Sequence, residues 1–217
     1  PRAVQSLPKP TVQPPRSLQN LPNTPLHPEQ TVIGNTQSDT PVEIVIEQRP
    51  QGLNPELANL GNSKDQIVYP LPEPVPVTSR FGWRVHPVTR VRRFHAGVDL
   101  GAAHGTPVLA SRGGKVVAAD RLGGYGLAVV MQHSDGTQDT LYAHLSQIFV
   151  RPGERIQPGT VIGRVGSTGL STGPHLHYEA RRKANTGWVA VDPGAQIEAA
   201  RIRLVQSRQN GQSQPQS

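Results

Sequence analysis

Five residues in three short stretches of this chain have the types and spacing of a metal-dependent hydrolytic site. They are His95 and Asp99, then His144, then the pair His175 and His177. Zinc in proteins prefers imidazole and carboxylate ligands in a tetrahedral shell, and a catalytic zinc site keeps one position for water. We therefore predict a zinc hydrolase site in which His95, Asp99 and His177 are ligands, while His144 and His175 transfer protons.

The even spacing within these stretches indicates that each pair projects from one face of a strand. In extended backbone, residues i and i+2 point to the same side. His175 and His177 therefore share a face, and so do His95 and Asp99, with Gly97 allowing a local bend between them. The helical zinc-binding motif H-E-x-x-H is absent from the sequence.

Each of these signals is weak when it is taken alone. A single histidine near a strand end is usually a surface or hydrogen-bonded residue, and a lone His-x-His pair is common without a metal. The remaining histidines are assigned to that ordinary kind, and they are His27, His86, His104 and His133. The joint pattern favours zinc, because four of the eight histidines fall into stretches with even spacing or flanking glycines.

Composition divides the chain near residue 77. Fifteen of the 22 prolines lie in residues 1–76, whereas 19 of the 22 glycines and eight of the nine aromatic residues follow. The first part carries a net charge of −2 and the remainder +9. We expect residues 1–76 to be a Pro- and Gln-rich extended or linker-like segment and residues 77–196 to be the folded domain. Residues 197–217 should form a short helix and a disordered tail.

Short β-branched runs separated by glycine turns follow residue 77. They are 106–110, 115–119, 127–132, 138–143 and 160–165. Runs this short at near-regular spacing are typical of antiparallel architectures, so we predict a mainly β, sandwich-like antiparallel domain. Residues 41–47 are expected to add one strand, and the alternating prolines of 71–76 to form an extended lead-in. The short helix is expected over residues 197–204.

Five motifs run through the second part of the chain in a fixed order. They are SRFGWR at 79–84, HAGVDL at 95–100, GTPV at 105–108, YAHL at 142–145 and GPHLHYE at 173–179. With these motifs, residues 78–193 resemble the LytM-type (lysostaphin-type) zinc metallopeptidases, which cut peptide cross-links in bacterial peptidoglycan. The resemblance covers about half of the chain and implies an antiparallel β domain with an open groove.

The resemblance also implies roles for individual residues. The family's zinc ligands fall on His95, Asp99 and His177, and its catalytic histidines fall on His144 and His175, with no position substituted. It therefore implies an active zinc metalloendopeptidase with one zinc ion per chain. Because imidazole ligands must be neutral to bind a metal, low pH should release zinc and lower activity.

Further residues of these motifs are expected to support the site or the substrate. Arg84 could form a bidentate pair with a substrate carboxylate. The alternative, an ion pair between Arg84 and an acidic residue of the protein itself, is at least as well supported. Tyr142 is expected to contact substrate or to support a ligand. Glu179 and Thr172 are candidates for holding the ligand imidazoles, with ordinary strand or turn roles as the alternative.

Two other functions are alternatives. The first is an autoinhibited or regulatory LytM-type protein that activates another cell-wall hydrolase. In that case a carboxamide or carboxylate of the N-terminal segment, such as Asn23, Asn35 or Asp39, would occupy the open zinc position. In the second, the glycine-turned runs belong to a biotin or lipoyl carrier module. That reading requires a modified lysine at a hairpin tip, and its only candidate, Lys115, lies within a predicted strand.

Charge and cysteine content limit the partners and the site chemistry. The basic domain favours a polyanionic partner, and the sequence has no nucleic-acid-binding motif, so peptidoglycan is expected rather than nucleic acid. The absence of cysteine excludes disulfides and thiolate ligands. No apolar run is long enough to span a membrane. The chain is expected to act in the cell envelope, periplasmic or extracellular, after loss of a leader or anchor.

Overall fold

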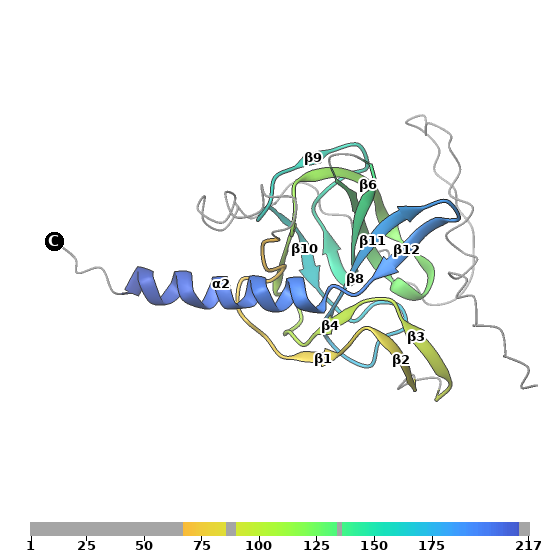
Figure 1. The fold of residues 1–217 in the computed structure, drawn as a ribbon, viewed down its shortest axis with the longest axis horizontal. Coiled ribbons are helices and arrows are strands. Elements are labelled where there is room, and N and C mark those ends of the chain that lie inside the picture. The colour runs from red at the N-terminus through yellow and green to blue at the C-terminus, as the bar shows by residue number, and fades with distance from the viewer. Residues whose placement is uncertain (1–66, 86–89, 134–135, 213–217) are drawn as a thin grey trace, which may run out of the picture.

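The computed structural model describes residues 67–85, 90–133 and 136–212. These residues form a ten-stranded sheet, a separate two-stranded hairpin and a long C-terminal helix (Figure 1). The strands are β1 (Val77–Ser79), β2 (Gly82–Val85), β3 (Arg92–His95), β4 (Val98–Leu100), β5 (Pro107–Leu109), β6 (Gly114–Arg121), β7 (Leu127–Gln132), β8 (Gln138–Ile148), β9 (Arg155–Ile156), β10 (Val161–Val165), β11 (Leu176–Ala184) and β12 (Gly187–Val191). A 3-10 turn, η2 (Gly123–Tyr125), precedes β7, and the helix is α2 (Gly194–Gln212).

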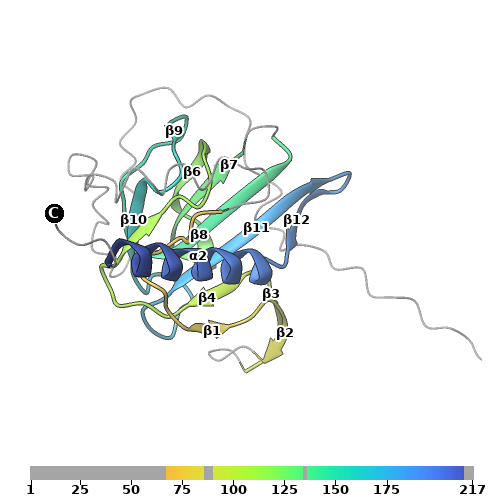
Figure 2. The same ribbon diagram turned by 60° about the vertical axis from the view of Figure 1, so that its left-hand side comes forward.

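The strands of the sheet pair in the order β1-β4-β11-β8-β7-β6-β9, with β12 beside β11 and β10 joining β8 to β5. All of the described strand pairs are antiparallel. The expectation of a mainly β, antiparallel domain is therefore confirmed. The strand expected at 41–47 lies outside the described residues. Figure 2 shows that β4, β11 and β8, which carry most of the candidate site, lie side by side.

Strand β7 shows why these residues form a buried sheet. Its side chains alternate between two apolar clusters: Leu127, Val129 and Met131 pack in the main core, whereas Ala128 and Val130 pack on the opposite face. Successive side chains of a strand point to opposite faces, so a continuous apolar run fits a strand that is covered on both sides. The second cluster includes residues of β8 that face the candidate site.

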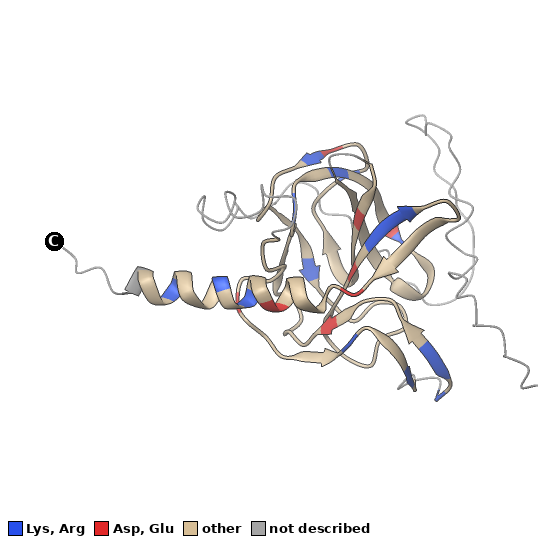
Figure 3. Ribbon diagram, in the orientation of Figure 1, with Lys and Arg blue, Asp and Glu red and all other residues tan. Residues whose placement is uncertain are grey.

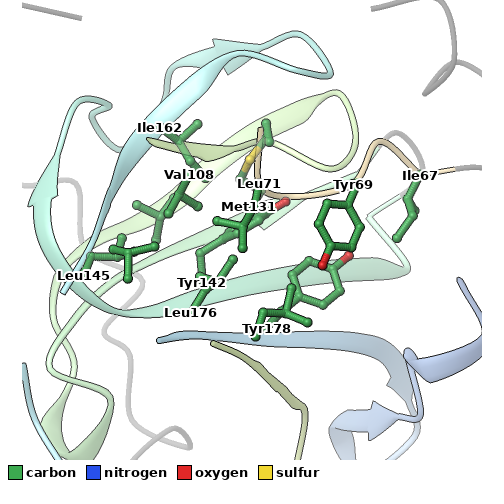
Figure 4. Close-up of a cluster of buried hydrophobic side chains, with 14 of the residues drawn as sticks. Ile67, Tyr69, Leu71, Val108, Met131, Tyr142, Leu145, Ile162, Leu176 and Tyr178 are labelled. Atoms are coloured by element: carbon green, nitrogen blue, oxygen red, sulfur yellow. The ribbon is translucent and has the colours of Figure 1, made fainter. Parts of the chain in front are cut away.

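The main core extends beyond the predicted domain limits at both ends. Figure 4 shows Ile67, Tyr69 and Leu71 among the side chains of this core. Ile67, Tyr69 and Leu71 are almost completely buried, although they belong to the segment expected to be linker-like. Helix α2 is also longer than the expected 197–204, and its Ile197 and Leu204 pack in the same core. The two ends contact each other, because Arg203 and Arg208 of α2 donate hydrogen bonds to the backbone carbonyl oxygens of Ile67 and Pro72. The packed part of the chain therefore begins before residue 77.

Basic residues gather on the outer parts of two hairpins, β2–β3 and β11–β12 (Figure 3). Arg92 and Arg93 lie in β3, and Arg182 and Lys183 lie in β11, all four exposed. In the described part of the chain, no helix combines the length and the apolar character needed to cross a membrane.

Candidate metal centre and its histidines

The three predicted ligands come from neighbouring strands. His95 ends β3, Asp99 lies in β4, and His177 lies in β11 directly opposite Asp99 in the strand register. Gly97 connects β3 to β4 where the backbone passes close to β11. A Cβ at this position would lie 2.3 Å from the carbonyl oxygen of Tyr178, so only glycine fits. Gly97 therefore permits close backbone approach, which is a more specific role than the expected bend.

Three ligand atoms of these residues converge on one point. Asp99 Oδ1 lies 3.0 Å from His95 Nε2 and 2.8 Å from His177 Nδ1, and the two nitrogens are 3.0 Å apart. All three residues are buried, with 5–7% of their surface exposed. The structure thus brings together the three residues that the sequence analysis selected, in an arrangement that could hold a metal ion.

The other ring nitrogens show which protonation state suits the site. His95 Nδ1 lies 2.8 Å from the carbonyl oxygen of Arg80, which can only accept, so this nitrogen carries a proton. His177 Nε2 is 2.9 Å from a carboxylate oxygen of Glu179 and donates to it in the same way. In the neutral rings, both nitrogens that face Asp99 therefore present lone pairs. Three acceptors at these distances repel one another unless positive charge lies between them.

The pKa values of the site indicate the same demand for positive charge. Burial raises the pKa of Asp99, but hydrogen bonds with His177 and His95 outweigh it and hold the pKa well below its usual range. Burial lowers the pKa of His177, but hydrogen bonds with Asp99 and Glu179 outweigh it and raise the pKa to about 9. The point where the three residues meet thus attracts a cation or a proton.

His144 reaches this site because β8 is irregular at this residue. Strict alternation would place residue 144 on the face of Tyr142, which packs in the main core, and away from the face of Ala143. The register of β8 against β7 shifts between Tyr142 and Leu145, which inserts one extra residue into β8. At the insertion, His144 takes a φ of +60°, in the left-handed region that favours glycine.

The two histidines predicted to transfer protons lie beside the ligand cluster. The ring centroid of His144 is 4.8 Å from that of His175 and 5.8 Å from that of His177. His175 Nε2 is 3.7 Å from Asp99 Oδ1. The structure therefore gathers all five predicted residues in one place.

Backbone carbonyl oxygens orient both of these histidines in the same way. His144 Nδ1 donates to the carbonyl oxygen of Thr168, and His175 Nδ1 donates to that of Gly173, each at 2.8 Å. In the neutral ring, Nε2 of each residue therefore carries the lone pair that can accept a proton. Burial, followed by the charge of His177, lowers the pKa of His144 to about 4.

Arg84 and Tyr142, the two predicted substrate-binding residues, have different surroundings in the structure. Arg84 Nη2 lies 3.2 Å from Asp99 Oδ2, so its guanidinium pairs with the ligand carboxylate, which agrees with the alternative of an internal ion pair. Tyr142 is fully buried, and its hydroxyl accepts from the backbone N–H of Ser111 at 2.8 Å. The expectation of a substrate contact was wrong for Tyr142, because its side chain points to the face of the sheet opposite His177.

The remaining predictions have mixed outcomes. Glu179 supports His177 directly, as described above, whereas Thr172 is exposed. His133 is a buried core residue that bonds the carbonyl oxygen of Gly113 and the hydroxyl of Thr140. His104 is exposed. Predictions that involve His27, His86, Asn23, Asn35 and Asp39 lie outside the described residues.

Sequence reasoning missed three residues that contact the site. Thr168 orients His144, while Tyr125 and Arg181 both contact Glu179. Arg181 could have been found, because alternation along β11 places residues 177, 179 and 181 on one face. No local signal points to Tyr125 or Thr168, since both lie outside the strands that carry the predicted residues, Tyr125 in η2 and Thr168 in the connection between β10 and β11.

Comparison with known proteins agrees with this geometry. Residues 93–200 match the model of peptidase family M23. The chain is 52% identical over 105 residues to the DD-carboxypeptidase/endopeptidase Mpg of Neisseria meningitidis serogroup B, covering 48% of this chain and 24% of the relative. It is 43% identical over 112 residues to the peptidoglycan DD-endopeptidase ShyA of Vibrio cholerae, covering 51% and 26%. The chain thus spans about a quarter of the length of these curated relatives.

One solved structure resembles this chain over most of the length of the solved domain. The catalytic domain of the antimicrobial peptidase lysostaphin from Staphylococcus simulans is 33% identical, with a TM-score of 0.51. The match covers 57% of this chain and 92% of that domain. The similarity therefore extends over a whole catalytic domain.

Proposed function

This chain belongs to peptidase family M23, and from that premise we propose that it is a zinc-dependent endopeptidase that hydrolyses cross-linking peptides of bacterial peptidoglycan. The site of action is then the cell envelope, periplasmic or extracellular. One observation carries the proposal: acceptor atoms of His95, Asp99 and His177 meet within 2.8–3.0 Å of one another. Such an arrangement calls for a cation.

The donor set fits zinc. Two imidazole nitrogens and one carboxylate oxygen are ligands that zinc prefers, and three protein ligands leave a position for water or substrate. When it is bound, zinc lowers the pKa of its water and polarises the scissile carbonyl. His95, Asp99 and His177 would hold one ion, and the carbonyl oxygen of Arg80 and the carboxylate of Glu179 keep the two imidazoles in the required tautomers.

His144 and His175 would move the protons of the reaction. Each presents Nε2 to the site while a backbone carbonyl oxygen holds Nδ1. One imidazole, neutral at Nε2, accepts a proton there from the attacking water. The other, when it is protonated at Nε2, stabilises the oxyanion or gives that proton to the leaving amine. Arg84 would orient the carboxylate of Asp99 through its contact with Oδ2.

The regulatory alternative is not favoured. A LytM-type protein that only activates another hydrolase would not require a full set of ligands and proton-transfer residues. This chain has all five, and the structure gathers them. The carrier-module alternative also lacks support, because Lys115 pairs with both neighbouring strands inside β6 instead of lying at a hairpin tip.

The test is mass spectrometry of purified peptidoglycan digested with this protein. We expect new peptide fragments that disappear in His144→Ala, disappear on removal of metal with a chelator and return when zinc is added. His104→Ala is the matched control, since it removes an exposed histidine outside the site. Fragments that persist in His144→Ala or after chelation would contradict the proposal.

A further inference from the structure

Glu179 lies behind the candidate metal centre and receives three hydrogen bonds from side chains. His177 Nε2 and the Tyr125 hydroxyl both donate to Oε1, at 2.9 and 2.7 Å, and Arg181 Nε donates to Oε2 at 2.7 Å. Glu179 is 1% exposed. A buried carboxylate is stable in its charged form only when its oxygens are paired, and these donors pair both of them.

Arg181 supplies the positive charge on this side of the sheet. It is 8% exposed and lies two residues beyond Glu179 on the same face of β11. Its Nε donates to Oε2 of Glu179 at 2.7 Å, so the guanidinium fixes the position of the carboxylate. Glu179, held there, accepts the hydrogen bond of His177 Nε2 and leaves Nδ1 to face Asp99.

Tyr125 lies in a turn that also contacts Thr168, the residue whose carbonyl oxygen orients His144. Gly126, which follows it, has a φ of +64°, and a Cβ there would lie 2.4 Å from Thr168 atoms. Thr168 in turn accepts from His144 Nδ1. The Tyr125 ring also lies near both neighbours of Glu179: its centroid is 5.7 Å from that of the His177 ring and 5.9 Å from the Arg181 guanidinium.

We propose that Tyr125 and Arg181 are positioning residues that act through Glu179 to hold His177 in the tautomer and orientation that bind the metal. The inference rests on the proposed function, because it assumes that His177 is a zinc ligand. It differs from a purely structural role in one measurable respect. Loss of either residue should weaken metal binding more than it weakens the fold.

The experiment measures zinc affinity of the full chain by chelator competition for Tyr125→Phe and Arg181→Met, together with thermal unfolding of the metal-free proteins. Residues that support a metal ligand typically change affinity by about 10–100-fold, and we expect losses in this range. The absorption spectrum of the cobalt(II)-substituted protein should also change. Arg181→Lys, which retains the charge, should recover part of the affinity.

Tyr142→Phe is the matched control for Tyr125→Phe. It also removes a hydrogen-bonded tyrosine hydroxyl, but from a fully buried residue on the opposite face of the sheet, where the hydroxyl bonds Ser111. This variant should lower the unfolding temperature without changing zinc affinity. In a Glu179→Gln background, Tyr125→Phe should have little further effect, since the two residues act through one contact.

The outcomes separate this inference from the function on which it rests. A wild-type chain that binds no zinc would overturn the proposed function. Wild-type binding that is unchanged in Tyr125→Phe and Arg181→Met, with only a lower unfolding temperature, would overturn the positioning role and leave the proposed function intact. Fully additive losses for Tyr125→Phe and Glu179→Gln would also contradict it.

Discussion

His177 and Asp99 face each other across the β4–β11 ladder, with Nδ1 of the histidine 2.8 Å from Oδ1 of the aspartate. Residues directly opposite in an antiparallel pair have close Cβ atoms, so backbone pairing alone brings these two side chains together. The strand that adds His95 is fixed by the close approach at Gly97. The metal site is therefore assembled mainly by strand register.

The first prediction concerns Asp99→Asn. The substitution preserves the shape of the side chain but removes the negative charge and replaces one carboxylate oxygen with an amide nitrogen, which donates instead of accepting. We expect zinc affinity to fall by at least 10-fold, because a neutral amide is a poor zinc ligand. Zinc content of the purified protein, measured by atomic emission, checks this. Asp120→Asn changes an exposed aspartate of β6 and should leave zinc content unchanged.

The second prediction uses the positive φ of His144. Both His144→Ala and His144→Gly remove the imidazole and should abolish turnover, but glycine adopts this conformation without strain. Alanine at this position is strained in the folded state, whereas glycine is not. Glycine has more conformational entropy in the unfolded chain, which offsets part of this advantage. We therefore expect His144→Gly to be more stable than His144→Ala by about 1 kcal/mol. Urea unfolding measures the difference.

The corresponding pair at His175 provides the control. Among the described residues other than glycine, only Arg90 and His144 have positive φ. Replacement of His175 by glycine therefore relieves no backbone strain. His175→Gly should therefore be less stable than His175→Ala. If His144→Gly were also less stable than His144→Ala, the backbone at His144 would not be strained.

The third prediction concerns Asp139, a carboxylate of β8 that is 5% exposed and has one oxygen without a hydrogen-bond partner. Burial raises its pKa to about 6, although Arg181 and Lys183 lower it in part. Ionisation of Asp139 therefore lowers the free energy of unfolding. The penalty is absent below the unfolded pKa near 3.8, grows as pH rises and is complete above about 6.

Asp139→Asn should remove this penalty. The variant is expected to be more stable than wild type by about 1–3 kcal/mol at pH 7.5, and the gain should vanish near pH 4. Urea unfolding at both pH values gives the comparison. A stability difference that does not change with pH would be inconsistent with a raised pKa for Asp139.

The fourth prediction distinguishes two truncations. Removal of residues 1–66 leaves the described core intact, whereas removal of residues 1–76 also deletes Ile67, Tyr69 and Leu71. Since a buried large apolar side chain stabilises by about 1.5–3 kcal/mol, the second truncation should lose roughly 5 kcal/mol. Urea unfolding tests the difference.

The shorter truncation also tests inhibition by the N-terminal segment. If residues 1–66 occupy the open zinc position, peptidoglycan hydrolysis should rise when they are removed. Unchanged turnover would reject that idea. A chain that begins at Val77 is unsuitable for this test, because loss of activity could follow from the loss of core residues.

Much of the fold follows from local pattern. The apolar alternation of β7 and the glycine turns around it predict an antiparallel β domain, because strand period and turn chemistry are properties of a few adjacent residues. The ends of the packed region are harder to predict. Tyr69 lies in a proline-rich stretch and the last turns of α2 contain few apolar residues, so only contact between the two ends reveals that they pack together.

Local pattern identifies the five histidine and aspartate residues of the site and places His175 with His177 and His95 with Asp99, because even spacing on extended backbone is a local property. The face that His144 occupies follows from the three-dimensional packing alone. Alternation predicts that it shares the face of Tyr142, and the extra residue in β8 reverses this. A bulge depends on hydrogen bonding to neighbouring strands, which come from distant parts of the chain, so spacing within β8 could not predict it.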